Sequence, residues 1–166
     1  MARWLTALVL AFTLLITSCA PTSPSPYEQV QQESSQRNAP PAVSRKATQG
    51  SEFNRFFPPQ ENGFERIYVQ EKKGFAEAKL KKDGKELAML AISDTISTPE
   101  AAAKFQHSTL QIAGYPAVEV GTTQTAVLVA NRYQVKVLSR DPSFTASDRK
   151  AWIEKFDLAG LAQLAP

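Results

Sequence analysis

One dipeptide, Asp83-Gly84, constrains the fold of this chain more than any other feature of the sequence. A type I′ turn needs positive φ at both central positions, and Asp-Gly is one of the pairs that adopt it most readily. Turning the chain there predicts an antiparallel hairpin with one apolar face, while Lys81 faces Glu86 on the other. The apolar face consists of the pairs Leu80 with Leu87, Ala78 with Met89, and Ala76 with Ala91.

A second hairpin is predicted in residues 125–139, TAVLVANRYQVKVLS. A turn on Asn131-Arg132 gives this hairpin one apolar face and leaves Gln134 and Lys136 on the other face. The apolar pairs are Ala130 with Tyr133, Leu128 with Val135, and Ala126 with Val137.

Two more segments have the composition of strands. Residues 65–70 precede the first hairpin and join it through a turn at Lys73-Gly74. Residues 110–121, LQIAGYPAVEVG, predict a strand that is broken near Gly114-Tyr115-Pro116, because proline and glycine interrupt regular strands.

Helices are predicted where capping residues precede apolar side chains. Ser51 can cap a short helix that carries Phe53, Phe56 and Phe57 on one face, and Pro58-Pro59 would end it. Trp152 and Phe156 lie at i and i+4 of a later helix and should share its buried face. The other predicted caps are Thr98 ahead of Pro99 and Glu100, Thr145 in a capping box with Asp148, and Asp157 ahead of Leu158, Leu161 and Leu164.

These elements predict an α+β fold: an antiparallel sheet of about six strands with two or three helices packed on one face. The order of three strands, a helix, three strands and a helix loosely resembles the extrinsic P protein of the photosynthetic oxygen-evolving complex. The phrases GFAEAKLKKDGKELA and KAWIEKFDL resemble uncharacterised lipoproteins of photosynthetic bacteria. That second resemblance implies no activity.

The only cysteine, Cys19, follows a 13-residue run that is mostly apolar and is preceded by Arg3. Such a run is too short to span a bilayer and is typical of a secretory signal peptide over residues 1–18. Ile16-Thr17-Ser18-Cys19 resembles the bacterial lipobox. The resemblance implies a lipidated Cys19 that anchors the chain in the bilayer, in the cell envelope facing the periplasm or an equivalent extracytoplasmic space. Ala20 after the cysteine favours the outer membrane.

Residues 20–50 are rich in proline, serine and glutamine, with five of each, and have almost no apolar content. Such a segment cannot bury enough surface to offset its ordering entropy, so residues 19–50 are expected to be a disordered tether. The remaining residues, 51–166, are enough for one domain. Without the leader the chain has 18 basic and 16 acidic side chains, a balance that does not favour nucleic-acid binding.

The sequence offers little catalytic chemistry. One cysteine and one histidine, His107, cannot form a thiolate or multi-histidine metal site within one chain. His107 follows a predicted short helix, where a structural role at the helix end is favoured. Neither a phosphate loop nor a nucleophile elbow is present, and nothing pairs Glu77, Asp94 or Glu119. We therefore expect no catalytic residues, no metal and no cofactor, and an uncharacterised hydrolase is the remaining enzymatic alternative.

Two sequence features are candidates for an interaction surface. One is aromatic and consists of Phe53, Phe56 and Phe57, which could instead close one end of the core. The other is basic and consists of Lys72, Lys73, Lys81 and Lys82, which flank two predicted turns and could instead keep an exposed edge soluble.

The function predicted from these features is that of a lipid-anchored, non-enzymatic binding or accessory module for an envelope or membrane complex, whose protein partner is unknown. The alternative is a carrier for a small apolar ligand or lipid held between the sheet and the helices. A large pocket at that place would favour the carrier, and a packed interior would count against it.

Overall fold

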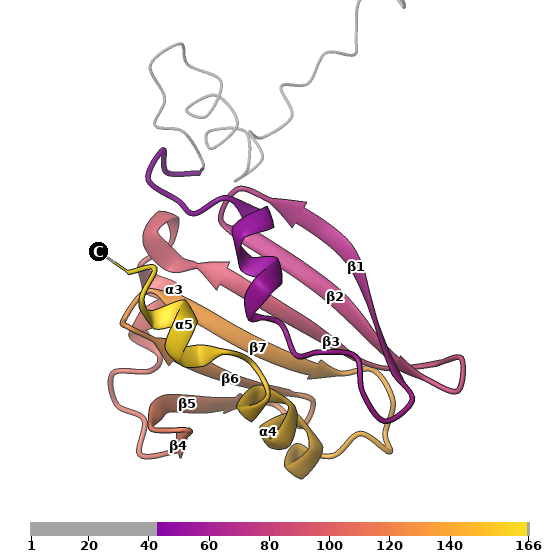
Figure 1. Ribbon diagram of the computed structural model, residues 1–166. Coiled ribbons are helices and arrows are strands. Elements are labelled where there is room, and N and C mark those ends of the chain that lie inside the picture. The colour runs from indigo at the N-terminus through magenta and orange to yellow at the C-terminus, as the bar shows by residue number, and fades with distance from the viewer. Residues whose placement is uncertain (1–42, 166) are drawn as a thin grey trace, which may run out of the picture. The chain divides into compact units, whose positions relative to one another are not determined.

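The computed structural model describes residues 43–165 and shows a single antiparallel sheet with helices on it (Figure 1). The strand order is β1-β2-β3-β7-β6-β5-β4, and every neighbouring pair is antiparallel. The strands are β1 Phe64–Lys72, β2 Phe75–Lys82, β3 Lys85–Asp94, β4 Gln111–Ile112, β5 Tyr115–Val120, β6 Gln124–Val129 and β7 Tyr133–Ser139. The predicted α+β class and antiparallel sheet are confirmed, with seven strands in place of about six.

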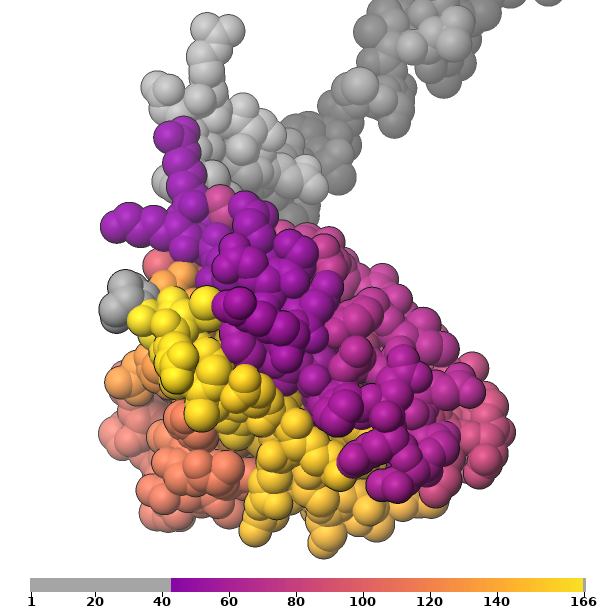
Figure 2. Space-filling model, in the orientation of Figure 1, coloured from indigo at the N-terminus to yellow at the C-terminus, as the bar shows by residue number. Residues whose placement is uncertain are grey.

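The helical segments divide between the two faces of the sheet. They are η1 Gly50–Phe56, η2 Thr95–Ser97, α3 Glu100–Ala103, α4 Ala146–Glu154 and α5 Leu158–Ala162. Segments η1, α4 and α5 lie on one face, where the indigo and yellow parts of the chain meet in Figure 2. Beyond α3, Phe105 covers Ala126 and Leu128, which point to the opposite face. The expectation of helices on one face therefore holds for all but the α3 region.

The seventh strand arises from the segment that the sequence predicted as one broken strand. Ala113 and Gly114 both have positive φ, 50° and 83°, and turn the chain sharply between β4 and β5. Tyr115 then pairs with Ile112, and Pro116 with Gln111. Proline has no N–H to donate to a neighbouring strand and is therefore found near sheet edges. Pro116 meets this condition because the only strand outside β5 is the two-residue β4.

The hairpin at Asp83-Gly84 forms as predicted, with φ of 50° and 77° at the two turn residues. Its register differs by one residue, because the pairing shifts between Leu80 and Lys81 and leaves Leu87 as the extra residue of a bulge. Lys81 still pairs with Glu86. The observed apolar pairs are Leu80 with Ala88, Ala78 with Leu90, and Ala76 with Ile92.

The second hairpin also differs from its prediction. The turn includes Ala130 as well as Asn131, with φ of 49° and 52°, so that Val129 pairs with Tyr133. One extra turn residue moves every side chain of β6 to the other face. The observed pairs on the core face are Val129 with Tyr133, Val127 with Val135, and Thr125 with Val137, while Ala126 and Leu128 lie on the opposite face.

Two predicted helix caps are wrong and two are confirmed. Segment η1 begins at Gly50 after Gln49 and has no side-chain cap from Ser51. Helix α3 follows Pro99 and receives no side-chain cap from Thr98, whose backbone carbonyl accepts from Ala101 instead. The confirmed caps are the Thr145–Asp148 capping box of α4 and the Asp157 carboxylate, which accepts from the Gly160 backbone N–H at 2.8 Å.

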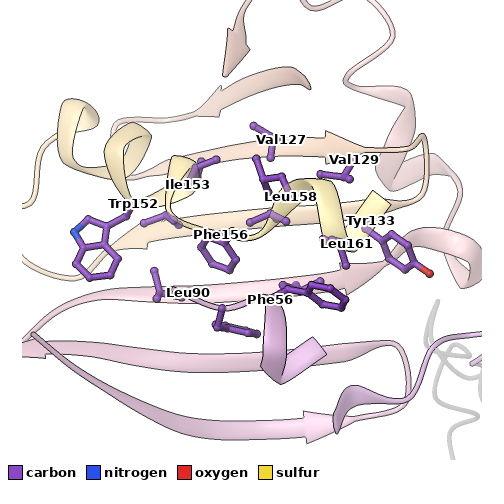
Figure 3. Packing of buried hydrophobic residues seen from close by; sticks show 14 of the residues in the cluster. Phe56, Leu90, Val127, Val129, Tyr133, Trp152, Ile153, Phe156, Leu158 and Leu161 are labelled. Atoms are coloured by element: carbon purple, nitrogen blue, oxygen red, sulfur yellow. The ribbon is translucent and has the colours of Figure 1, made fainter. Parts of the chain in front are cut away.

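The core lies between the sheet and the η1, α4 and α5 segments, as Figure 3 shows. Trp152, Ile153, Leu158 and Leu161 come from the helices and join one buried cluster with side chains of strands β2 to β7. Aromatic rings interlock there, with centroid distances of 4.9 Å for Phe64–Trp152, 5.3 Å for Phe57–Phe156 and 5.8 Å for Phe53–Tyr133. The predicted burial of Trp152 and Phe156 is confirmed.

The folded part of the chain begins before Ser51, the boundary expected from the sequence. Ala47 is buried, and the Thr48 carbonyl accepts a hydrogen bond from the Gly74 N–H at 2.7 Å. The Ser44 N–H donates to Ser97 Oγ at 2.8 Å. Residues 44–50 therefore belong to the domain. The expected signal peptide, Cys19 and residues 20–42 of the expected tether lie outside the described residues.

A buried ion pair fastens residues 44–48 to one end of the sheet. The Asp94 side chain is fully buried and accepts from Arg132 Nε at 3.0 Å, Arg132 Nη2 at 2.8 Å and the Thr48 N–H at 2.9 Å. Arg132 Nη2 also donates to the Lys46 carbonyl at 3.0 Å. We call Asp94, Arg132 and Thr48 the Asp94 clamp.

Candidate functional site

The three phenylalanines of the expected interaction surface are inside the core. Phe53, Phe56 and Phe57 are exposed by 0%, 3% and 5%. Segment η1 turns their rings toward Tyr133 and Phe156, so that they close the core above the sheet. They cannot form a docking surface in this fold, and the alternative considered for them, closing the core, is what the structure shows.

The four lysines of the expected basic surface do not form one patch. Lys72 and Lys73 lie at the turn between β1 and β2, and Lys81 and Lys82 lie at the turn between β2 and β3. These turns are at opposite ends of β2, whose eight residues extend about 25 Å. The structure therefore separates them into two pairs.

Several of these lysines have local roles in the fold. Lys73 Nζ donates to the Arg45 carbonyl at 2.8 Å, which helps to hold the N-terminal segment. The ammonium of Lys82 lies 4.7 Å from the ring centre of Phe64, and that of Lys72 lies 5.4 Å from the ring centre of Phe75. Such cation–π contacts are weakly stabilising at exposed sites. The basic cluster is thus partly accounted for by contacts within the domain.

Three consecutive exposed apolar side chains lie on β1, which the sequence analysis did not single out. Strand β1 is at one end of the sheet, and within residues 43–165 no strand pairs with its outer side. Ile67, Tyr68 and Val69 in its middle are 43%, 36% and 45% exposed. We call residues 64–72 the β1 edge. A long edge strand with apolar side chains is a template for pairing with another chain.

One face of the β1 edge is held firmly by the domain. The Tyr68 hydroxyl donates to the Asn54 carbonyl at 2.9 Å, and its ring contacts Phe57 with centroids 5.4 Å apart. Arg66 Nη1 donates to the carbonyls of Phe57 and Pro58. Burial raises the pKa of Tyr68, an effect that the nearby Arg66 charge reduces, so the phenol keeps the proton that it donates.

The other side of the β1 edge is open. Ile67 pairs with Lys79, whose neighbours Ala78 and Leu80 point into the core, so Ile67 points to the opposite face of the sheet. A register shift between Tyr68 and Gln70 makes Val69 the extra residue of a bulge. Bulges and charged ends are devices that limit indiscriminate edge pairing, and charged residues flank the apolar centre here.

A cue for this surface was present in the sequence. The stretch Ile67-Tyr68-Val69 is apolar at three consecutive positions, whereas a half-buried strand alternates. At least one of the three had to face solvent, or a partner. Propensity alone could not show that β1 would be an edge strand, because its place in the sheet depends on pairings between distant segments.

The acidic residues and the histidine that the sequence analysis considered are not brought together. Asp94 is engaged in the Asp94 clamp, Glu119 is exposed on β5, and Glu77 pairs with Ala91 on β2. His107 is exposed in the turn after α3. Among residues 43–165 no group of three His, Cys, Asp or Glu side chains is placed to hold a metal ion.

Comparison with known proteins adds no family: no family model, no curated protein and no solved structure matches this chain. The helices described for residues 43–165 are all too short to cross a membrane.

Proposed function

We propose that this chain is a lipid-anchored, non-enzymatic binding module that presents the β1 edge to a protein of the cell envelope. The observation that carries the proposal is the exposure of Ile67 and Val69 in the middle of a nine-residue strand whose outer side is unpaired within residues 43–165. The partner would add an extended segment to the sheet.

The physical basis is strand addition. Main-chain hydrogen bonds to an open edge supply affinity, and side chains at alternate positions supply selectivity. The contacts of Tyr68 and Arg66 with η1 and the following loop already fix the strand, so little ordering entropy is lost on binding.

The anchor is the second part of the proposal. The lipobox resemblance around Cys19 implies two or three acyl chains, and each buried methylene contributes about 0.8 kcal/mol to membrane binding. The 24 residues between Cys19 and Ser44 would span about 27 Å as a random coil. The domain would then stay within a few nanometres of the bilayer, where a membrane complex could meet the β1 edge.

The carrier alternative has less support. It requires a large apolar cavity between the sheet and the helices, but Trp152, Ile153 and Leu161 fill that space together with Leu90 and other strand residues in one buried cluster (Figure 3). A packed interior at this place counts against a ligand held there.

Site-specific photo-crosslinking in intact cells tests the proposal. A photoreactive residue at Ile67 or Val69 should yield the same discrete adduct, and the adduct should weaken with Cys19→Ala because the domain leaves the membrane. Val120, which is 46% exposed on another strand, is the matched control position and should yield none.

Two results would count against it. An adduct of twice the chain's own mass would mean that the β1 edge pairs with a second copy. Equal labelling from positions 67 and 120 would mean that the β1 edge has no selective partner.

A further inference from the structure

A cavity of about 420 Å³ lies at the end of the sheet where β6 begins and β7 ends. Its wall is formed by the β5–β6 turn, the segment after β7 and the first turn of α4. The lining residues that matter below are Arg149, Arg140, Ser139, Phe144, Pro142 and Asp141. None of them belongs to the β1 edge, and the cavity borders the packed core only through Phe144.

Arg149 is the unusual residue of this cavity. It is 2% exposed, yet its guanidinium forms no ion pair with a carboxylate of residues 43–165. Nε donates to Thr125 Oγ1 at 2.8 Å and Nη1 donates to Ser139 Oγ at 3.0 Å. Two neutral hydroxyls satisfy part of the hydrogen-bonding capacity but leave the charge without compensation.

A buried charge without a counter-ion is costly, because desolvation is not offset by a nearby opposite charge. Arginine has five N–H donors, and Arg149 uses two of them in these hydrogen bonds. Nη2 has no hydrogen bond to residues 43–165, so Arg149 keeps donors that a carboxylate oxygen can accept from.

The other charges around the cavity are largely committed. Asp141 pairs with Lys85 at 2.6 Å, and hydrogen bonds from Lys85 and Ser143 lower the pKa of Asp141 to about 2. Asp148 is held in the capping box by Thr145. Arg140 Nε lies 4.0 Å from Glu86, a long contact, with the side chain half exposed. The cavity therefore has an excess of about one positive charge, to which the N-terminal end of α4 adds.

From this geometry we propose that the cavity binds a small organic monocarboxylate, with its carboxylate against Arg149 and its body against Phe144 and Pro142. One negative charge matches the excess positive charge. The volume is at the lower end of the range for organic ligands and is larger than an inorganic anion needs. Arg140 at the rim would contribute a second, solvent-screened attraction.

The test is a titration of the isotope-labelled full-length protein at pH 7 followed by amide and arginine side-chain NMR signals. Benzoate is the probe, because it combines one carboxylate with an apolar ring. Benzamide has the same shape without charge, and inorganic phosphate has the charge without an apolar body. Benzoate should give saturable shifts confined to residues 122–125 and 139–149 and to the Arg149 side chain.

Two variants sharpen the test. Arg140→Gln changes a half-exposed residue and should leave the fold intact while weakening benzoate binding by up to about tenfold. Arg149→Lys keeps the buried charge but loses the planar fork, and should weaken binding by more than that. Lys150→Gln, next to Arg149 but exposed and not in the cavity wall, should leave binding unchanged.

The outcomes decide the proposal directly. It is overturned if benzoate produces no saturable shifts, if benzamide binds as well, or if phosphate binds more tightly than benzoate. If Arg149→Lys fails to fold, the dependence on charge in the wild type and the Arg140→Gln result still decide it.

Discussion

The two ends of strand β7 differ in what compensates the charge of a nearby arginine. Beside Tyr133, Arg132 meets the Asp94 carboxylate through two nitrogens, and the pair also holds the Thr48 N–H. Beside Ser139, Arg149 is more deeply buried but meets only hydroxyls. The first end is neutralised within the domain and acts as a structural lock. The second keeps an uncompensated charge next to a cavity, which is typical of a binding site and not of a lock.

The largest expected effect comes from breaking the ion pair between Asp94 and Arg132. Asp94→Ala would leave the Arg132 guanidinium half-buried without its partner and the Thr48 and Ile96 N–H groups without an acceptor. Breaking a buried pair on one side costs about 3 kcal/mol or more of unfolding free energy. Urea unfolding of the variant measures the cost. A loss below about 1 kcal/mol would mean that the Asp94 clamp is not a lock.

The next effect concerns how closely the N-terminal segment approaches the sheet at the same end. A Cβ at Gly50 would lie 2.5 Å from the Lys72 carbonyl oxygen and 2.7 Å from the Phe75 carbonyl oxygen. Backbone atoms cannot move aside cheaply, so Gly50→Ala should destabilise the domain by about 2 kcal/mol. Gly84→Ala is a poor control because Gly84 has positive φ. Ala103→Gly on the exposed helix α3 serves as the control and should lower the unfolding free energy by only about 1 kcal/mol.

A smaller effect is expected at the cavity end. Thr145→Ala removes the hydroxyl that accepts from the Asp148 N–H and donates to the Asp148 carboxylate. Loss of an N-cap costs about 1 kcal/mol. Thermal unfolding measures this loss, and Thr145→Ser should restore most of it. A cost equal to that of Asp94→Ala would remove the contrast between the two ends.

The smallest expected effect is the loss of stability when Asp94 becomes protonated at low pH. Burial by itself raises the pKa of Asp94, but hydrogen bonds from Arg132, Thr48 and Ile96 outweigh it, so the pKa in the folded protein lies below the ordinary value of 3.8. The unfolded chain then binds a proton more readily as pH falls below 3.8, and the contribution of Asp94 to stability is lost between that pH and the lowered pKa. Chemical unfolding between pH 5 and pH 2.5 should show this loss. In Asp94→Asn the unfolding free energy should fall less steeply as the pH is lowered. If the unfolding free energy of the variant depends on pH as steeply as that of the wild type, the loss of stability comes from other carboxylates such as Asp141.

Several of the local features predicted from a few adjacent residues are confirmed, whereas the caps at Ser51 and Thr98 are not. The turn at Asp83-Gly84 and the Thr145–Asp148 capping box are among the confirmed features. Strand register was not predicted correctly. Residues 125–130 are apolar on both faces, and their pattern cannot distinguish a two-residue turn from a three-residue turn. The bulge at Leu87 has the same origin, since Leu87, Met89 and Ala91 form an apolar face as plausible as Ala88, Leu90 and Ile92.

The functional surfaces were harder to predict than the elements that carry them. Phe53, Phe56 and Phe57 were expected either outside or inside, and only the position of η1 over the sheet decides between the two. The lysines at the two predicted turns were considered as one basic surface, but the turns lie at opposite ends of the extended strand β2. The Arg149 cavity depends on β6, β7 and α4 meeting at one end of the sheet, and no local motif encodes that meeting.

The way in which residues 44–48 join the sheet also determines how the domain would bear mechanical load. Tension applied through the chain before Ser44 first reaches the Ser44–Ser97, Lys46–Arg132 and Thr48–Asp94 hydrogen bonds, which follow one another along residues 44–48. These bonds must yield before force can reach η1 and the core behind it. The Arg149 cavity, about 20 Å away along β7, lies off this load path. Tension from the N-terminal side would therefore load these hydrogen bonds before it loads the residues that line the cavity.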